Sequence, residues 1–222
     1  MRFLSAFVTV AVALFLAGCN SSTSANKSNF AKAINAKFAS ECIVVNPGAN
    51  AGAALSGNQY PVGVKEEKPG SGAFGFTQAQ VDKQNAADFG PFDALVKAGL
   101  LTVTTGKVKP MFGPESAGKI YSLTTEGETA QPSKDGLSFC AGHWHVKEVT
   151  DFTAPSKGFN GATFSTVQFT YTASDVPSWV SAAVDAGFPN LKQTNGSPGK
   201  AKADVTQTDN GWSAVIGTLN PQ

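Results

Sequence analysis

The sequence predicts an α+β protein with a helical N-terminal part, an antiparallel sheet with one packed helix after it, and a disulfide that joins the two parts. Three observations predict this arrangement. Apolar residues recur at helical spacing in several segments before residue 100. After residue 136, longer segments are rich in β-branched and aromatic residues at the alternate spacing of half-buried strands. Each part also contains one cysteine outside the N-terminal leader.

The first residues, MRFLSAFVTVAVALFLAGCN, are typical of a secretion signal. Arg2 precedes an apolar run over residues 3–16, and small residues follow the run. This run is shorter than the roughly 20 residues that a membrane-spanning helix needs. We therefore expect residues 1–18 to be a signal peptide that is removed from the mature protein.

The end of this segment, Leu16-Ala17-Gly18-Cys19, resembles the lipobox of bacterial lipoproteins. The resemblance implies cleavage before Cys19, a diacylglyceryl thioether on its sulfur and an acylated new N-terminus. Several acyl chains anchor a protein stably, since each buried methylene contributes about 0.8 kcal/mol. By analogy with enterobacterial lipoproteins, Asn20 in place of an aspartate favours the outer membrane, with the protein facing the periplasm. The alternative is an ordinary signal peptide that leaves a soluble periplasmic protein.

The charge balance argues against a nucleic-acid partner. The only arginine, Arg2, is lost with the leader, which leaves 16 lysines against 16 acidic residues. Arginine is the preferred bidentate ligand of phosphates and guanine, and nucleic-acid-binding domains are normally strongly basic. The full sequence has 41% hydrophobic residues and 16 phenylalanines, of which three lie in the leader, so the mature chain can bury a substantial core as one domain or two small ones.

The expected organisation follows the composition. Residues 19–28 are mostly small and polar, so we expect a flexible tether there. A helix-rich part over residues 29–130 and a β-rich part over residues 131–222 follow, and whether these two form one domain stays open. The first helix is predicted from apolar residues at helical spacing, namely Phe30, Ala33, Ile34 and Phe38.

Cys42 lies four residues beyond Phe38 on the same helical face and should point inward. Once Cys19 carries lipid, only Cys42 and Cys140 remain, in an oxidising compartment. We therefore predict a disulfide between them. It closes a loop of about 100 residues, for which chain entropy gives about 4 to 5 kcal/mol. The alternative is two buried unpaired thiols.

Residues 47–75 are rich in Gly, Ala, Pro and Asn, and we expect a loop with one short strand over residues 60–64. The stretch Gly70-Ser71-Gly72-Ala73-Phe74-Gly75 matches the GxGxxG pattern of dinucleotide-binding sites. That site needs a hydrophobic strand before the glycines and a helix that begins among them. Residues 65–69 are charged and the next helix begins only after Thr77, so we assign the glycines no nucleotide.

Thr77 and Gln80 form a capping box, and Phe76 with Val81 suits a hydrophobic staple, which predicts a helix over residues 78–87. A second helix is expected over residues 91–98, because proline is favoured in a first helical turn and glycine follows at position 99.

Two paired strands are expected next, over residues 101–107 and 119–125, with a Gly- and Pro-rich loop between them. The string LVKAGLLTV, a loop and then KIYSLTTEG resembles the last helix and wing of winged-helix domains over residues 78–127. Members of that family that bind DNA carry basic residues on the helix and the wing. This helix offers only Lys97, so the resemblance implies a structural or protein-binding use.

The β-rich part is expected to contain four strands and one helix. The strands are predicted over residues 137–152, 162–172, 203–208 and 212–216. Asn210-Gly211 between the last two is a strong hairpin signal. The helix is predicted over residues 177–186, with a buried stripe of Trp179, Val180, Ala183 and Val184.

The stretch SFCAGHWHVKEV contains Cys140 and both histidines of the chain. Alternate residues of a strand face opposite sides, so Cys140 and Trp144 should face the core and the histidines should face outward. A bulge at Gly142 would change this register.

His143 and His145 form a same-face pair and are the candidate metal ligands. Zinc binds three or four ligands, and Lys147 beside the pair repels a cation. We therefore expect no metal and no other cofactor.

No nucleophile elbow, HExxH motif, P-loop or CxxC pair is present, and we expect no catalytic residues. The first functional hypothesis is a non-enzymatic envelope lipoprotein that binds another periplasmic or membrane protein, as an inhibitor, immunity factor or assembly accessory. The alternative is a lipoprotein that binds a small ligand or a metal. A hydrolase whose acids meet only in three dimensions is a third, weaker class. A deep apolar cavity would favour a ligand, and exposed apolar side chains would favour a protein partner.

Overall fold

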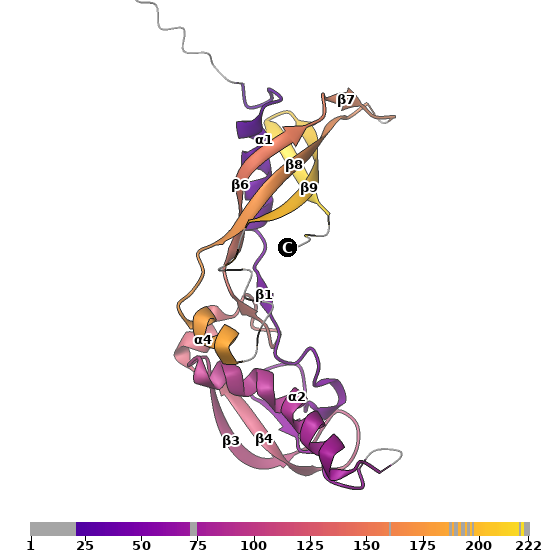
Figure 1. Ribbon diagram of the computed structural model, residues 1–222, viewed down its shortest axis with the longest axis vertical. Coiled ribbons are helices and arrows are strands. Elements are labelled where there is room, and N and C mark those ends of the chain that lie inside the picture. The colour runs from indigo at the N-terminus through magenta and orange to yellow at the C-terminus, as the bar shows by residue number, and fades with distance from the viewer. Residues whose placement is uncertain are drawn as a thin grey trace, which may run out of the picture.

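The computed structural model describes residues 21–71, 75–159, 161–186, 188, 191, 194, 196, 198–217 and 219. The expected signal peptide, the lipobox with Cys19, and part of the GxGxxG stretch lie outside these residues. The described chain is mixed α+β with antiparallel sheets, as the sequence predicts. Figure 1 shows an elongated molecule with two lobes and a narrow middle.

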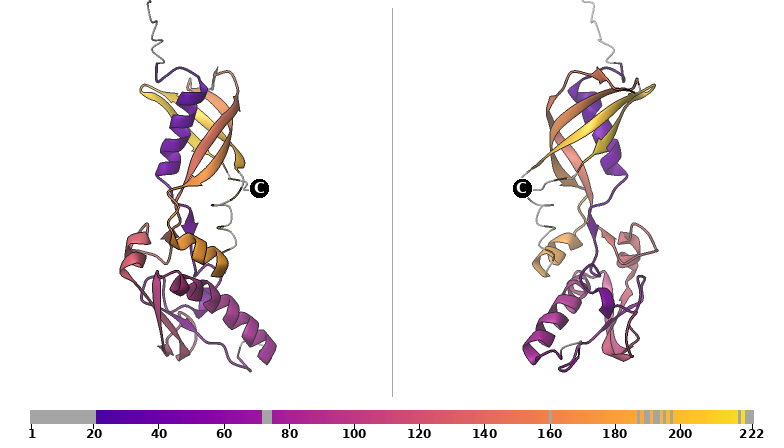
Figure 2. Two further views of the ribbon diagram at one scale, coloured as in Figure 1. Left: turned by 60° about the vertical axis from the view of Figure 1, so that its left-hand side comes forward. Right: turned by 90° about the vertical axis from the view of Figure 1, so that its right-hand side faces the viewer.

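The sheet lobe consists of one helix and an antiparallel sheet of order β10-β9-β8-β6, with β7 paired to the start of β8. Its elements are α1 (Lys27–Ala39), β6 (His143–Phe152), β7 (Ser156–Lys157), β8 (Thr163–Ser174), β9 (Gly199–Thr208) and β10 (Gly211–Ile216). Helix α1 covers one face of the sheet (Figure 2). The predicted buried residues of α1 all lie in this core, and the hairpin predicted at Asn210-Gly211 is confirmed.

The hairpin lobe contains the other long helix and a three-stranded sheet of order β2-β4-β3. Its elements are η1 (Gly52–Ala54), β2 (Val62–Lys65), α2 (Gln78–Lys97), β3 (Leu101–Val108), β4 (Ser116–Leu123), α3 (Thr125–Ala130) and α4 (Trp179–Ala186). The strand pair β3–β4 follows α2 as predicted. Strand β2 adds a third strand to this pair, and the expectation of a helical N-terminal part with a winged-helix-like hairpin is not supported.

Helix α2 corrects the expectation of two helices over residues 78–87 and 91–98. It is continuous from Gln78 to Lys97 and contains Pro91. Proline in a helix interior removes one backbone hydrogen bond. Phe92 and Leu95 after it are fully buried in the lobe core, and this packing holds the helix through the proline. At its start, the Thr77 N–H donates to Gln80 Oε1 at 2.8 Å, as the capping box requires.

Helix α4 forms near its expected position, but its packing differs from the prediction. Trp179, Val180 and Ala183 are buried in the hairpin lobe, where α4 packs on α2. The one helix packed on the β-rich sheet is α1, from the other end of the sequence. Helical periodicity identifies an apolar face but not the surface that will cover it.

The buried side chains form two clusters, one in each lobe, and each cluster combines segments from both sides of residue 130. The expected boundary between a part over residues 29–130 and a part over residues 131–222 stays a prediction. Buried clusters show which segments pack together, but they do not show which segments fold independently.

The middle of the molecule is a two-stranded junction with the predicted disulfide. Strand β1 (Val44–Val45) pairs with β5 (Phe139–Cys140). Cys42 and Cys140 are bonded, with their Cα atoms 5.3 Å apart and a sequence separation of 98. The disulfide prediction is therefore confirmed. Residues 137–152, expected as one strand, form the separate strands β5 and β6.

The described part of the expected tether is held against the sheet lobe. Gln207 Nε2 donates to the Thr23 carbonyl at 3.0 Å, and Trp212 Nε1 donates to the Ser24 carbonyl at 3.3 Å. Asn29 Nδ2 donates to the Ser21 carbonyl at 2.9 Å, and α1 already begins at Lys27. Small polar residues have little apolar surface to bury, but their backbone carbonyls accept hydrogen bonds.

The disulfide should contribute a large share of the stability. Replacing both Cys42 and Cys140 with alanine is expected to lower the free energy of unfolding by about 2 to 5 kcal/mol, since the loop that the bond closes is long. Denaturant unfolding with the intact and dithiothreitol-treated wild type checks this. Reduction should lower the unfolding midpoint of the wild type and leave the midpoint of the double variant unchanged. Equal midpoints for all samples would contradict the prediction.

Candidate functional site

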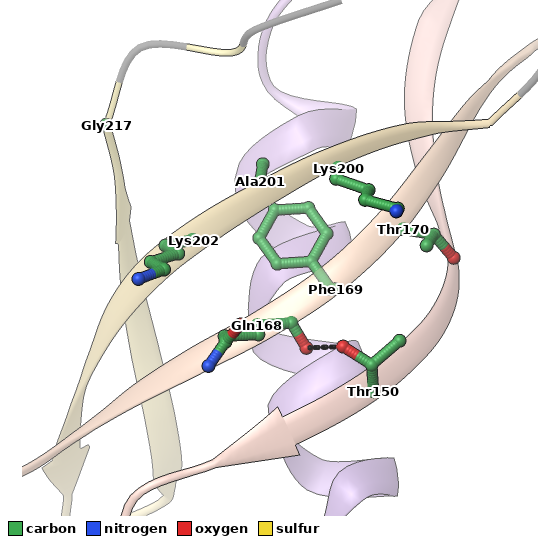
Figure 3. A pocket seen from close by; sticks show the side chains of 8 residues that line it. All are labelled: Thr150, Gln168, Phe169, Thr170, Lys200, Ala201, Lys202 and Gly217. Atoms are coloured by element: carbon green, nitrogen blue, oxygen red, sulfur yellow. Dashed lines mark hydrogen bonds between the residues drawn. The ribbon is translucent and has the colours of Figure 1, made fainter. Parts of the chain in front are cut away.

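A wide hollow lies on the face of the four-stranded sheet that α1 leaves open (Figure 3). Its volume is about 640 Å³. It is lined by residues of β6, β8 and β9 and by the residue after β10, namely Thr150, Gln168, Phe169, Thr170, Lys200, Ala201, Lys202 and Gly217.

The strand alternation explains the composition of this hollow. Phe169 and Ala201 form its floor, and their side chains belong to the core beneath α1. Gln168 lies opposite Lys202 on the neighbouring strand, and Thr170 lies opposite Lys200, so these four side chains share the outer face.

Neither lysine of the hollow has an ion-pair partner among the residues that the structure describes. The Thr150 hydroxyl donates to the Gln168 carbonyl at 3.1 Å. The hollow is thus wide, polar and weakly enclosed, unlike the apolar pockets that bury most of a small molecule. It can offer ammonium, amide and hydroxyl donors to a polar ligand.

The histidine region departs from the expected alternation. His143 lies beside the disulfide: its ring and the Cys42 and Cys140 sulfurs place one potential ligand atom each within 4.8 Å of one another. His143 Nδ1 is 2.9 Å from the Glu41 carbonyl oxygen. His145 is exposed and does not belong to this group. Both histidines line a second hollow of about 360 Å³.

The cause of this departure is Gly142, which separates β5 from β6. Its φ is +115°, and an added Cβ would lie 2.6 Å from the Ser174 carbonyl oxygen. The turn at this glycine changes the register that a continuous strand would have, so Cys140 and His143 do not lie on opposite faces. Trp144 packs on the sheet-lobe core, as predicted, and its ring also contacts Tyr171.

The bond between the sulfurs decides what the group can hold. Cysteine binds a metal ion as a thiolate, and a disulfide offers no thiolate. While the bond is intact, His143 is the only ligand of the three. No other group of three His, Cys, Asp or Glu ligand atoms lies this close within the described ranges.

A polar network in the hairpin lobe involves Glu67. This residue lies in a charged stretch of sequence, which is typical of a solvent-exposed loop. Lys65 Nζ lies 2.6 Å from Glu67 Oε1, and the Ser71 hydroxyl donates to Glu67 Oε2 at 2.8 Å. Asn85 on α2 bonds both backbone groups of Glu67. Burial alone would raise the pKa of Glu67, but the contacts of Lys65 and Ser71 hold it below its ordinary value.

Asp88 lies near this network and has the opposite shift. Burial raises the pKa of Asp88, against the lowering effect of hydrogen bonds from Gln84, and the Glu67 charge raises it further. Two carboxyl groups with separated pKa values are typical of acid–base catalysis. The Asp88 residue is only 1% exposed, however, so a substrate has no access to it, and we interpret the network as a tie between α2 and the chain after β2.

The loop between β3 and β4 exposes two large apolar side chains. Met111 is 58% exposed and Phe112 is 72% exposed. The loop backbone is fixed, because the Met111 N–H donates to the Leu55 carbonyl at 2.8 Å and Lys109 Nζ donates to the Gly113 carbonyl at 3.1 Å. We name residues 109–113 the hairpin-tip loop. Sequence reasoning placed a loop here but assigned it no role.

No protein-family model, no curated protein and no solved structure matches this chain. The resemblance to winged-helix domains therefore gains no support from known proteins. Among the residues that the structure describes, no helix is both long and apolar enough to cross a membrane.

The role of Gly142 in the turn can be tested by substitution. Gly142→Ala is expected to lower the free energy of unfolding by about 2 kcal/mol or more, because the added methyl group meets the Ser174 carbonyl and the positive φ is strained. Urea unfolding measures the change. Gly57→Ala is the control, since its Cβ meets nothing within 4 Å. Equal losses in the two variants would contradict the assigned role of Gly142.

The raised pKa of Asp88 predicts a pH-dependent contribution to stability. A raised carboxyl pKa means that the folded state binds the proton more tightly than the unfolded state, whose pKa is about 3.9. The stability that this tighter proton binding contributes is fully present below the unfolded-state pKa, and it is lost as the pH rises through the raised pKa of the folded state. Asp88→Asn should therefore be more stable than the wild type at pH 7, with the advantage shrinking towards pH 3. Urea unfolding across this range checks it, and an advantage that grows on acidification would refute it.

Proposed function

We propose that the chain is a non-enzymatic, lipid-anchored protein of the cell envelope that binds another envelope protein through the hairpin-tip loop. Exposed Met111 and Phe112 on a fixed loop are the observation that carries this proposal. Methionine and aromatic residues are enriched at protein interfaces, where a few such side chains account for most of the binding energy.

The fixed backbone of the loop supports this role energetically. Association immobilises side chains and loops, and the entropy that is lost subtracts from affinity. The bonds of Met111 to Leu55 and of Lys109 to Gly113 hold the loop before a partner arrives. We further infer that α2 and the β3–β4 hairpin serve as its scaffold, which is the structural use that the winged-helix resemblance implies.

The position of the loop fits an anchored protein. The lipobox precedes the N-terminal end of α1, and Figure 1 places the hairpin lobe at the opposite end of the long axis. An anchor on Cys19, in the outer membrane and facing the periplasm, would leave the hairpin-tip loop free to meet a partner away from the bilayer.

A small polar ligand is the second candidate function, favoured by the hollow over β6, β8 and β9. Lys200 and Lys202 offer two ammonium groups there without ion-pair partners in the described structure. The weak enclosure of the hollow makes this candidate second to a protein partner.

A photo-cross-linking experiment in cells tests the first candidate. The photoreactive residue p-benzoylphenylalanine replaces Phe112, which keeps an aromatic ring at that position, or replaces Val215 on β10, which is 69% exposed and serves as the control. We expect a discrete protein adduct from position 112 only. An additional Met111→Ser change should reduce its yield at least about tenfold, since central anchors contribute 2 kcal/mol or more.

The outcomes separate the candidates. No adduct from position 112, or the same adducts from both positions, overturns the proposed interface. A metabolite that co-purifies with the wild type but not with a Lys200→Ala, Lys202→Ala variant would favour the small-ligand function. The anchor is tested on its own, because Cys19→Ala should release the protein from the membrane fraction.

A further inference from the structure

We propose that the turn between β7 and β8, with Phe159 at its tip, inserts into the lipid bilayer and holds the sheet lobe against the membrane surface. The inference rests on the proposed lipid anchor at Cys19 and goes beyond it, because it assigns a second membrane contact and an orientation.

Only a short stretch of chain separates the proposed anchor from the folded residues. Ser21 is bonded to Asn29 on α1, and Thr23 and Ser24 are bonded to the β9–β10 hairpin. Cys19 precedes Ser21 by two residues, which span at most about 7 Å. A lipid on Cys19 therefore brings this end of the sheet lobe to the bilayer surface.

The β7–β8 turn lies at the same end of the sheet lobe as the start of α1. Phe164 on β8 pairs with Thr206 on β9, and the neighbouring Gln207 is the residue that holds Thr23. Figures 1 and 2 show that the start of α1, the β9–β10 hairpin and β7 all lie at the same end of the long axis. The turn thus lies at the same end of the molecule as the segment that leads to the anchor.

Large apolar side chains are exposed at this end of the molecule. Phe159 is fully exposed, at 115% of its reference area, and Phe164 is 40% exposed. The turn is closed by two backbone bonds, from the Gly158 N–H to the Ala162 carbonyl and from the Gly161 N–H to the Gly158 carbonyl, both 2.9 Å. A phenylalanine on a fixed, projecting turn suits the boundary between headgroups and acyl chains, where burying the ring is favourable.

The charges at this end are mixed, which determines the kind of membrane contact. Lys27 begins α1 and Lys157 lies on β7, whereas Asp209 lies in the β9–β10 turn. Attraction to anionic lipids needs a cluster of basic residues, and the described residues at this end form none. The contact is therefore apolar and should not require anionic lipid.

The test uses the full lipidated protein, reconstituted into phosphatidylcholine vesicles whose acyl chains carry bromine, a quencher of indole fluorescence. Phe159→Trp places an indole at the turn, and Phe112→Trp places one in the hairpin lobe, which lies towards the other end of the long axis, as the matched control. The wild type, with three native tryptophans, gives the background.

We expect quenching of the Phe159→Trp protein to exceed the wild-type background at least about twofold, with the same result when half of the lipid is anionic. The Phe112→Trp protein should show only the background. Flotation of the same vesicles reports the anchor separately. A wild type that does not float overturns the anchor and this inference together. A floating protein in which the Phe159→Trp indole is not quenched, or in which both indoles are quenched equally, overturns this inference alone.

Discussion

The disulfide between Cys42 and Cys140 is the constraint on which the arrangement of the two lobes depends. The chain first leaves the sheet lobe after α1 and returns to it at β6, and both of these crossings pass through the β1–β5 pair beside this bond. It crosses again from β8 to α4 and back to β9. A two-stranded pair of this length is marginal by itself. The covalent bond closes the long excursion between the crossings, so the hairpin lobe is held to the sheet lobe at a fixed point.

Local patterns predicted most elements of this fold because they depend on neighbouring residues. The α1 stripe, the start of α2, the β3–β4 pair and the β9–β10 hairpin all form as expected. The packing partners could not be predicted in the same way. An apolar stripe such as that of α4 fits any apolar surface, and whether it meets a sheet or α2 depends on the path of residues far away in sequence. The continuity of α2 through Pro91 likewise depends on tertiary packing.

The side chains that come together in the candidate sites could also be predicted only in part from the sequence. Compartment and cysteine count predicted the disulfide, but only the positive φ of Gly142 brings His143 beside it. The hollow on the sheet requires the register that aligns Gln168 with Lys202, and alternation alone does not give that register. Met111 and Phe112 would be core residues in most patterns, and only the short loop between β3 and β4 leaves them exposed.

The proposed anchor and the observed packing together define how far the hairpin-tip loop can reach. A lipoprotein on a long flexible linker samples a wide volume above the membrane, and its binding surface has no defined height. Here the segment from Ser21 to Ser24 is bonded to the sheet lobe, so an anchor at Cys19 allows little pivoting. The height of the hairpin lobe above the bilayer would then be set by the length of the molecule and its disulfide-bonded middle, rather than by a tether. A partner that meets this loop must present its own surface at that height, which favours a protein fixed in the envelope over one that diffuses freely.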